Sequence, residues 1–178
     1  MNTGQTIITM GALILLTVAV LNFNKTLSYS DISLAQNRYR LEALSIITSY
    51  IEQASQYYFD EVSTDTTSAK QLSDFTLPNN LGFDSNDNSI IDDFDDFNNY
   101  TVIDTGISGI MYRVHFKVDY VKLQGDQVVT SSNKEYNKRM NISVTDNFSD
   151  PLIYKYINGQ KVKDTLSVSF VNCYWFYN

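Results

Sequence analysis

The sequence predicts an α+β protein in which a long N-terminal α-helix packs on a C-terminal antiparallel β-sheet. No glycine or proline occurs between Gly11 and Pro78, so neither of the residues that commonly end helices interrupts this stretch. Apolar residues there recur at helical spacing. From Tyr100 onward apolar and polar residues alternate, a pattern typical of antiparallel strands with one buried face and one solvated face.

The first part of this helix is apolar on all sides. Residues 7–21 read IITMGALILLTVAVL, and no charged side chain precedes Lys25. A membrane-spanning helix needs about 20 mostly apolar residues, and residues 5–24 approximately meet this requirement. Because residues 1–4 lack the basic residues of a secretory signal peptide, a retained anchor is favoured. A removed signal peptide and the buried helix of a soluble core remain alternatives.

The second part of the helix is amphipathic. One stripe follows the spacing of a helix face, and its apolar residues are Leu44, Ile47, Ile51, Ala54 and Tyr58. A continuous helix over residues 5–60 would be roughly 80 Å long at 1.5 Å per residue. Two helices with a break near residues 22–25 or 28–33 are the alternative. We expect the stripe to cover the apolar face of the sheet.

Acidic residues concentrate in one segment. The whole chain has 20 acidic and 13 basic residues and a net charge of −7, which makes nucleic acid an unsuitable partner because its phosphates need clustered Lys and Arg. Residues 60–100 contain ten acids, and Lys70 is their only base. Such local acidity indicates one site or surface. It would bind cations or meet Lys and Arg of a neighbouring copy.

Within this segment, residues 84–95 read DSNDNSIIDDFD and match part of a calcium-loop template. Oxygen ligands at positions 1, 3, 5, 9 and 12 of such a loop would be Asp84, Asn86, Asn88, Asp92 and Asp95. Ser89 replaces the glycine of the template, and Asp95 is shorter than the usual glutamate. A calcium site and a solvated acidic loop both remain open.

The alternating pattern predicts the strands of the sheet. Residues 112–120 form one strand, and in residues 138–144 the apolar face carries Lys138, Met140, Ile142 and Val144. Residues 152–157 form a shorter strand that ends at the hairpin signal Asn158-Gly159, and residues 166–177 form a closing strand. The predicted organisation is therefore a leader and apolar helix (1–27), an amphipathic continuation (28–62), an acidic loop region (63–99) and a sheet domain of four or five strands (100–178).

Few residues offer catalytic chemistry. The chain has one histidine and one cysteine, which excludes a Cys/His zinc site because such sites need about four ligands of these types. His115 falls on the polar face of a predicted strand, and Cys173 stands among aromatic residues, where a buried inert thiol is expected. Without a convincing nucleophile–base pair, we do not predict an enzyme.

A short polar leader that ends in Gly4, an apolar helix continuing into an amphipathic one, and then an antiparallel sheet resemble type IV pilins and pseudopilins. Three further segments resemble minor pilins of this group: ALSIITSYIEQASQYYFDE (43–61), FDDFNNY (94–100) and YNKRMNISV (136–144). The resemblance covers most of the chain.

The resemblance implies a divergent or minor structural subunit of an extracellular filament. A prepilin peptidase would cleave between Gly4 and Gln5, and methylation is also implied. The apolar helix would then form the filament core, including Ile7, Ile8, Gly11, Leu13, Leu15, Val18 and Leu21. Implied partners are copies of this chain or other pilins, the inner membrane before assembly, and the pilus assembly machinery.

The sequence departs from the family pattern in several ways: it lacks a basic leader and the helix-kinking proline usual in the early twenties, and Gln5 stands where pilins usually have Phe or Met. Pilins usually carry glutamate at the fifth mature position, which here is Thr9. A neutral hydroxyl cannot replace a carboxylate that pairs with a neighbouring subunit's N-terminus. This favours the alternative function, a single-pass membrane-anchored binding module on the periplasmic or extracellular side that does not polymerise.

Overall fold

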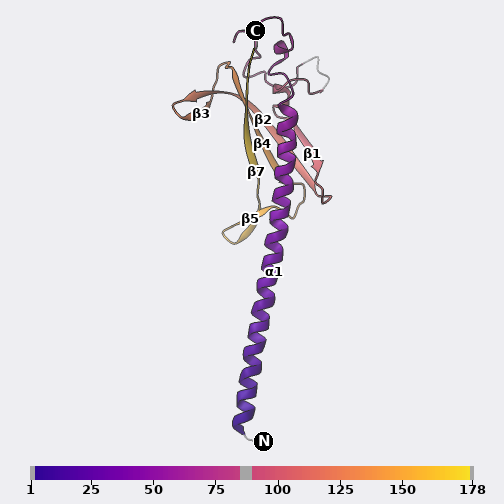
Figure 1. Cartoon of the computed structure of the whole chain (residues 1–178), viewed down its shortest axis with the longest axis vertical. Helices are drawn as coiled ribbons and strands as arrows, with labels where there is room; N and C mark the ends of the chain where they lie inside the picture. The colour runs from indigo at the N-terminus through magenta and orange to yellow at the C-terminus, as the bar shows by residue number, and fades with distance from the viewer. Residues whose placement is uncertain (1–2, 85–89, 177–178) are drawn as a thin grey trace. The chain divides into compact units, whose positions relative to one another are not determined.

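The structure, a computed structural model, describes residues 3–84 and 90–176. Helix α1 (Thr3–Ala54) has 52 residues and no break, which confirms the long helix and excludes the predicted alternative of two helices (Figure 1). The chain forms two compact units, Met1–Tyr39 and Arg40–Asn178. The first contains the apolar part of α1 and the start of its amphipathic part, and the second contains the rest of α1 and the sheet.

The second unit confirms the predicted α+β class. After α1 the chain forms η1 (Glu61–Thr64), η2 (Asp95–Phe97), β1 (Thr101–Thr105), β2 (Met111–Gln124), β3 (Gln127–Thr130), β4 (Asn137–Asp146), β5 (Tyr154–Ile157), β6 (Gln160–Lys163) and β7 (Leu166–Cys173). A five-stranded antiparallel sheet has the order β1-β2-β4-β7, with β3 paired to β2, and β5 and β6 form a separate pair.

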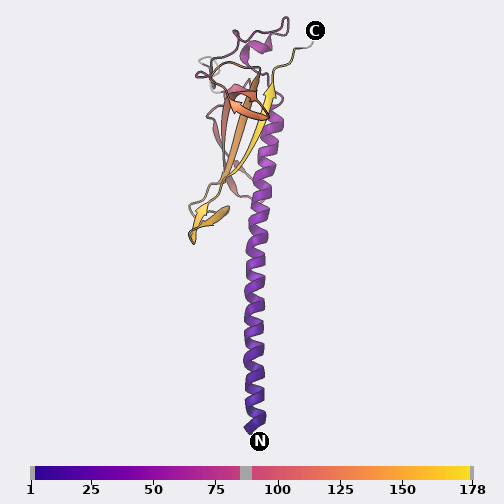
Figure 2. The same cartoon turned by 90° about the vertical axis from the view of Figure 1, so that its left-hand side faces the viewer.

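The core lies between this sheet and the last turns of α1. In β4, and in β2 from Met111 to Tyr120, every second side chain is buried, and the register places Phe116 opposite Ile142. The Tyr50 ring of α1 meets the Phe116 ring edge-on at 5.1 Å between centroids. Figure 2 shows these strands from the side, next to the C-terminal turns of α1.

The helix face that is buried differs in part from the predicted stripe. Ile47 and Ala54 are buried as predicted, but Leu44 is 38% exposed and Tyr58 51% exposed. Ala43 and Ile46 are buried instead. The buried residues still follow the spacing of one helix face, but that face is rotated from the predicted stripe toward Ala43 and Ile46. Tyr58 lies beyond the end of α1.

Because of this rotation, alanine substitutions at two nearby positions of α1 should differ in how much they lower the stability of the fold. Ile47→Ala should lower the free energy of unfolding by about 2–4 kcal/mol, because it leaves a cavity between helix and sheet. Leu44→Ala, at an exposed position three residues away, is the matched control and should cost about 1 kcal/mol or less. Urea unfolding of both variants measures the difference. Equal losses would mean that the sheet packs on the predicted stripe.

Polar contacts also attach α1 to the sheet. The hydroxyls of Ser108 and Tyr112 donate to Glu42 Oε2 at 2.5 and 3.0 Å. Between them, a Cβ atom added at Gly106 would come within 2.8 Å of Glu42 Oε2. The connection from β1 to β2 thus passes so close to α1 that a larger residue at position 106 would displace the Glu42 or Tyr112 side chain.

The predicted hairpin is confirmed. Asn158 and Gly159 join β5 to β6 with φ angles of 52° and 77°, the left-handed conformations that a two-residue type I′ turn needs. The predicted strand ends are less accurate: β5 begins at Tyr154 rather than at residue 152, and β7 ends at Cys173 rather than at residue 177.

Candidate functional site

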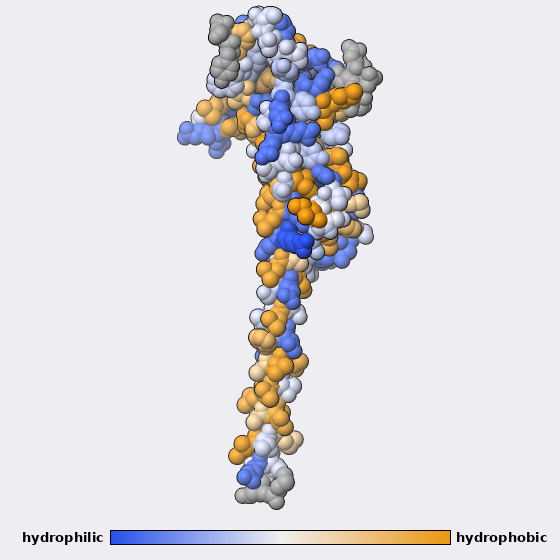
Figure 3. Space-filling model, turned by 45° about the vertical axis from the view of Figure 1, so that its right-hand side comes forward, coloured by the Kyte–Doolittle hydropathy of each residue, from blue (hydrophilic) through white to orange (hydrophobic). Residues whose placement is uncertain are grey.

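The apolar surface of the first unit is the first candidate. All the predicted filament-core residues lie on α1, and the large ones are exposed: Ile7 70%, Ile8 73%, Leu13 62%, Leu15 72%, Val18 50% and Leu21 62%. Figure 3 shows hydrophobic side chains, in orange, along much of this helix. By length and composition, α1 contains a stretch that could cross a membrane, and none of that stretch is buried.

Several hydroxyl groups of this unit donate to backbone oxygens of the same helix. The Thr9 hydroxyl donates to the backbone oxygens of Gln5 and Thr6 at 3.1 and 2.9 Å. Gly4 and Gln5, the predicted cleavage site, lie in the first turn of α1. A Cβ atom at Gly11 would meet nothing within 4 Å, so the small residue leaves room for another helix to approach.

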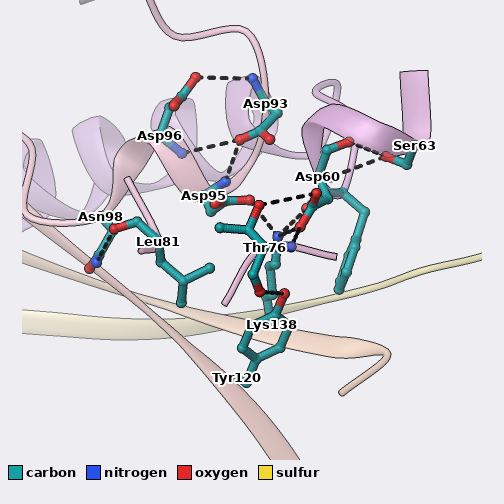
Figure 4. A network of polar contacts seen from close by, with 11 residues as sticks. Asp60, Ser63, Thr76, Leu81, Asp93, Asp95, Asp96, Asn98, Tyr120 and Lys138 are labelled. Atoms are coloured by element: carbon teal, nitrogen blue, oxygen red, sulfur yellow. Dashed lines mark hydrogen bonds and ion pairs between the residues drawn. The ribbon is translucent and has the colours of Figure 1, made fainter. Parts of the chain in front are cut away.

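The second candidate is a buried lysine in the second unit. Lys138 of β4 is fully buried, with its ammonium group among acidic side chains (Figure 4). Its Nζ donates to the Phe59 backbone oxygen at 2.7 Å, to Asp60 Oδ2 at 2.9 Å and to Asp95 Oδ1. A buried charge of this kind must be paired, because an unpaired ammonium group loses its hydration without compensation.

Two separate segments bring acids to this lysine. Asp60 follows α1 and precedes η1, and its carboxylate also accepts the Thr76 backbone N–H at 2.9 Å. Asp95 opens η2. Asp93 Oδ1 accepts the backbone N–H groups of Asp95 and Asp96 at 2.8 and 3.2 Å. We call Asp60, Asp93, Asp95, Asp96 and Lys138 the buried charge cluster.

Two aromatic rings lie beside the Lys138 ammonium group. Lys138 Nζ lies 4.4 Å from the Phe59 ring centroid and 5.4 Å from that of Tyr120, its cross-strand neighbour on β2. The Tyr120 hydroxyl donates to the Thr76 backbone oxygen at 2.8 Å. Burial, followed by the charge of Asp60, raises the pKa of Tyr120, so this hydroxyl stays protonated and keeps its donor role.

Burial also alters the acids. Desolvation is the main cause that raises the pKa of Asp93 to about 8, and the neighbouring charge of Asp95 adds to it. Desolvation raises the pKa of Asp95 to about 6, although Lys138 opposes this shift. At neutral pH Asp93 therefore holds its proton, and the cluster contains less negative charge than its four acids suggest.

These shifts predict that the fold loses stability as the pH rises. In the unfolded chain Asp93 has a pKa near 4, so between about pH 4 and 8 the folded state binds more protons. Stability should be greatest below this window and fall through it, by at most about 1.4 kcal/mol per pH unit for each proton. Urea unfolding between pH 4 and 9 measures the slope.

Asp93→Asn tests the origin of that slope. An asparagine Oδ1 can still accept the N–H groups of Asp95 and Asp96, but it cannot titrate. The variant should flatten the pH dependence above about pH 6, whereas Asp150→Asn, at an exposed position, should leave it unchanged. An unchanged slope in Asp93→Asn would assign the dependence to other groups.

Among the described residues, the carboxylates of the predicted calcium loop do not form a group with the spacing of a metal site. Asn86 and Asn88 lie outside the described residues. Asp84 and Asp92 are exposed, while the Asp95 carboxylate binds Lys138. Calcium binding by residues 84–95 stays a prediction. If it is correct, calorimetric titration with millimolar calcium should release or absorb heat, and the melting temperature should rise. If neither effect is observed, the segment is a solvated acidic loop.

A different set of acids has the spacing of a metal site. One carboxylate oxygen from each of Asp60, Asp93 and Asp95 lies within 4.8 Å of the other two. The Lys138 ammonium group contacts two of these three acids. It thereby supplies the positive charge that a metal ion would otherwise supply. For Asp60 and Asp95 the positive charge comes from within the chain, while cation binding or contact with a neighbouring copy stays a prediction for the rest of the acidic segment.

Sequence reasoning placed Lys138 on the apolar strand face but did not identify it as a site. The available signal was a lysine in register with Met140, Ile142 and Val144, since a charge on a core face needs a partner. Nothing in the sequence names Asp60 as that partner, because the two residues are 78 positions apart. His115 is exposed and contacts Thr101 Oγ1 at 2.9 Å, and Cys173 is partly buried.

Comparison with protein-family models, with curated proteins and with solved structures found no match to this chain.

Proposed function

We propose that this chain is a structural subunit of a type IV pilus-like filament and that it polymerises through the apolar part of α1. The supporting observation is the exposed apolar surface of residues 7–21, where Ile8 and Leu15 are 73% and 72% exposed. The resemblance of the sequence to minor pilins adds the class of filament. Its partners would be copies of this chain or other pilins.

Two environments can cover such a helix in turn. Lipid covers it before assembly, and copies of the same helix cover it in the filament. Moving a helix from lipid to a helix bundle yields little hydrophobic gain, so close packing at small residues such as Gly11, Ala12 and Ala19 must contribute. Against water, burial in the filament core stabilises by roughly 25 cal/mol per Å² of apolar surface.

The second unit would then form the outer surface of the filament. Its polar strand face, which includes His115, Lys117 and Ser169, is exposed, as a surface in water requires. Before assembly the chain would reside in the inner membrane, and a prepilin peptidase would remove residues 1–4.

Thr9 favours a second candidate function. Its hydroxyl donates to the backbone of its own helix, so it offers the N-terminus of another copy a neutral acceptor oxygen but no negative charge. A membrane-anchored binding module needs no such contact. In that case the same helix would hold the second unit at a membrane surface without polymerising.

Microscopy of sheared cell surfaces separates these functions. Negative-stain images and mass spectrometry of the sheared material should show filaments that contain this chain, with a mass that lacks residues 1–4. Recovery of the chain only from detergent-extracted membranes, as a monomer with its full N-terminus, would contradict the filament proposal and support the anchored module.

A further inference from the structure

We propose that the second units of neighbouring copies join head to tail, with Ile107 of one copy inserted into an apolar groove of another. This inference rests on the proposed filament function and names a contact between its subunits. Ile107 lies in the connection between β1 and β2 and is 95% exposed. The groove lies near the other end of β2, where the β2–β3 hairpin approaches β7.

The chain holds Ile107 in a fixed position. The Gly109 backbone N–H donates to the Gly106 oxygen at 2.9 Å, and the Ser108 hydroxyl donates to Glu42 Oε2 on α1 at 2.5 Å. A single exposed isoleucine is ordinary on a protein surface. An isoleucine presented by an anchored turn differs, because little conformational freedom is lost when a partner covers it.

Two further apolar side chains flank Ile107 in the chain. Ile103 of β1 is 51% exposed and Met111 of β2 is 42% exposed. Met111 lies opposite Thr105 in the register of the two strands, so Ile103 and Met111 share one face of the sheet, since side chains alternate along a strand. We call Ile103, Ile107 and Met111 the apolar knob.

The groove has apolar walls that are open to solvent and a volume of about 270 Å³. Among its lining residues Val121 is buried, whereas Leu123, Val128 and Val171 are 72%, 47% and 39% exposed. Leu123 and Val128 face each other across the β2–β3 hairpin. Such a hollow, lined by apolar side chains with few polar groups, suits an apolar side chain of a partner.

The positions of knob and groove favour a second copy as the occupant. Met111 is the first residue of β2, and Leu123 is the last but one. At 3.3 Å per residue the two patches are about 40 Å apart along this strand, so they cannot meet within one chain. A surface and its complement at opposite ends of one molecule form a contact that repeats from copy to copy, and such heterologous contacts build open filaments.

The contact is too small to join two copies alone. A stable interface buries about 800 Å² and roughly 20–30 residues on each partner, whereas the described lining of the groove comprises six residues. In the filament, α1 holds the copies together and raises the effective concentration of the knob at the groove. The contact therefore forms in filaments and not between monomers in detergent.

Disulfide trapping in sheared filaments tests this contact. The double variant Ile107→Cys/Leu123→Cys, with Cys173→Ala to remove the native thiol, should give a ladder of dimers and larger multimers after oxidation. Each copy then carries one knob cysteine and one groove cysteine, which bond only when their Cα atoms come within about 7 Å. Filaments mixed from the two single variants should stop at dimers, and the double variant in detergent should stay monomeric.

Several outcomes would contradict the contact. Filaments of the double variant without a ladder would overturn it and leave the filament proposal intact, whereas a wild type without filaments would overturn both. Dimers from Ile107→Cys alone would indicate a symmetric contact and also overturn it. The control pair Ile107→Cys/Ile157→Cys, whose second position is 47% exposed but outside the groove, should give no ladder. An equal ladder from this pair would overturn the contact as unspecific trapping.

Ile107→Lys tests the contact without engineered cysteines in the chain. The wild-type side chain is 95% exposed, so the substitution should leave urea unfolding of the second unit unchanged. In the filament it would place a positive charge in an apolar groove beside Lys122. These filaments should dissociate at a lower temperature than wild-type filaments, and those of Ile157→Lys should not. Ile107→Lys filaments as heat-stable as the wild type would overturn the proposal.

Discussion

Lys138→Met should lower the free energy of unfolding of the second unit by about 3–5 kcal/mol, the usual cost of leaving a buried charge without its partner. Methionine has a similar length and fits an apolar site, so the loss would come from Asp60 and Asp95 rather than from a cavity. The loss also includes the contacts through which Lys138 joins β4 to η2 and to Phe59 and Asp60, which follow α1. Urea unfolding monitored by circular dichroism measures it.

Lys117→Met is the matched control for that experiment. Lys117 lies on the polar face of β2 with its side chain 59% exposed, 3.8 Å from Asp119, and surface pairs contribute about 0–1 kcal/mol. The double variant Lys138→Met/Asp95→Asn should recover part of the lost free energy of unfolding, because it removes one of the two carboxylates that Lys138→Met leaves without their cation. A Lys138→Met variant as stable as the Lys117→Met control would show that the buried charge cluster does not hold the fold together.

Leu15→Arg should abolish filament formation. Leu15 is 72% exposed in the middle of the apolar part of α1, and an arginine at the centre of a membrane helix costs about 2.5–3.5 kcal/mol on insertion. In a filament core the same charge would meet apolar side chains of neighbouring copies. Microscopy of sheared material and the share of the chain in membranes are the two measurements.

Leu15→Met controls for the loss of leucine, because it conserves volume and apolar character, and it should assemble as the wild type does. The unfolding of the second unit, Arg40–Asn178, should be unchanged in both variants, since position 15 lies in the first unit. Normal filaments in Leu15→Arg would contradict assembly through the apolar part of α1.

Sequence patterns predicted the local features of this fold well. The absence of glycine and proline predicted an unbroken helix, and Asn158-Gly159 predicted a hairpin, because both depend on neighbouring residues alone. The alternation in β2 and β4 predicted which side chains face the core, Lys138 included. The buried face of α1 was less predictable, because the sheet selects among overlapping apolar stripes that differ by one position, as Ala43 and Leu44 do.

Long-range pairing was not predictable from one sequence. Asp60, Asp93 and Asp95 belong to an acidic run that suggested a surface, yet each is buried. Their burial depends on meeting Lys138, which lies 78 residues from Asp60. A charged residue on a core face indicates that a partner exists, but spacing in the chain does not identify it.

Photo-cross-linking from within α1 tests the proposed assembly most directly. A photoactivatable amino acid at position 15 records what covers the apolar helix at the moment of illumination. In sheared filaments we expect covalent dimers and larger multimers of this chain or adducts with other pilins, and in membranes we expect lipid adducts. Monomers with lipid adducts in every fraction, and no chain-to-chain product, would contradict polymerisation through α1.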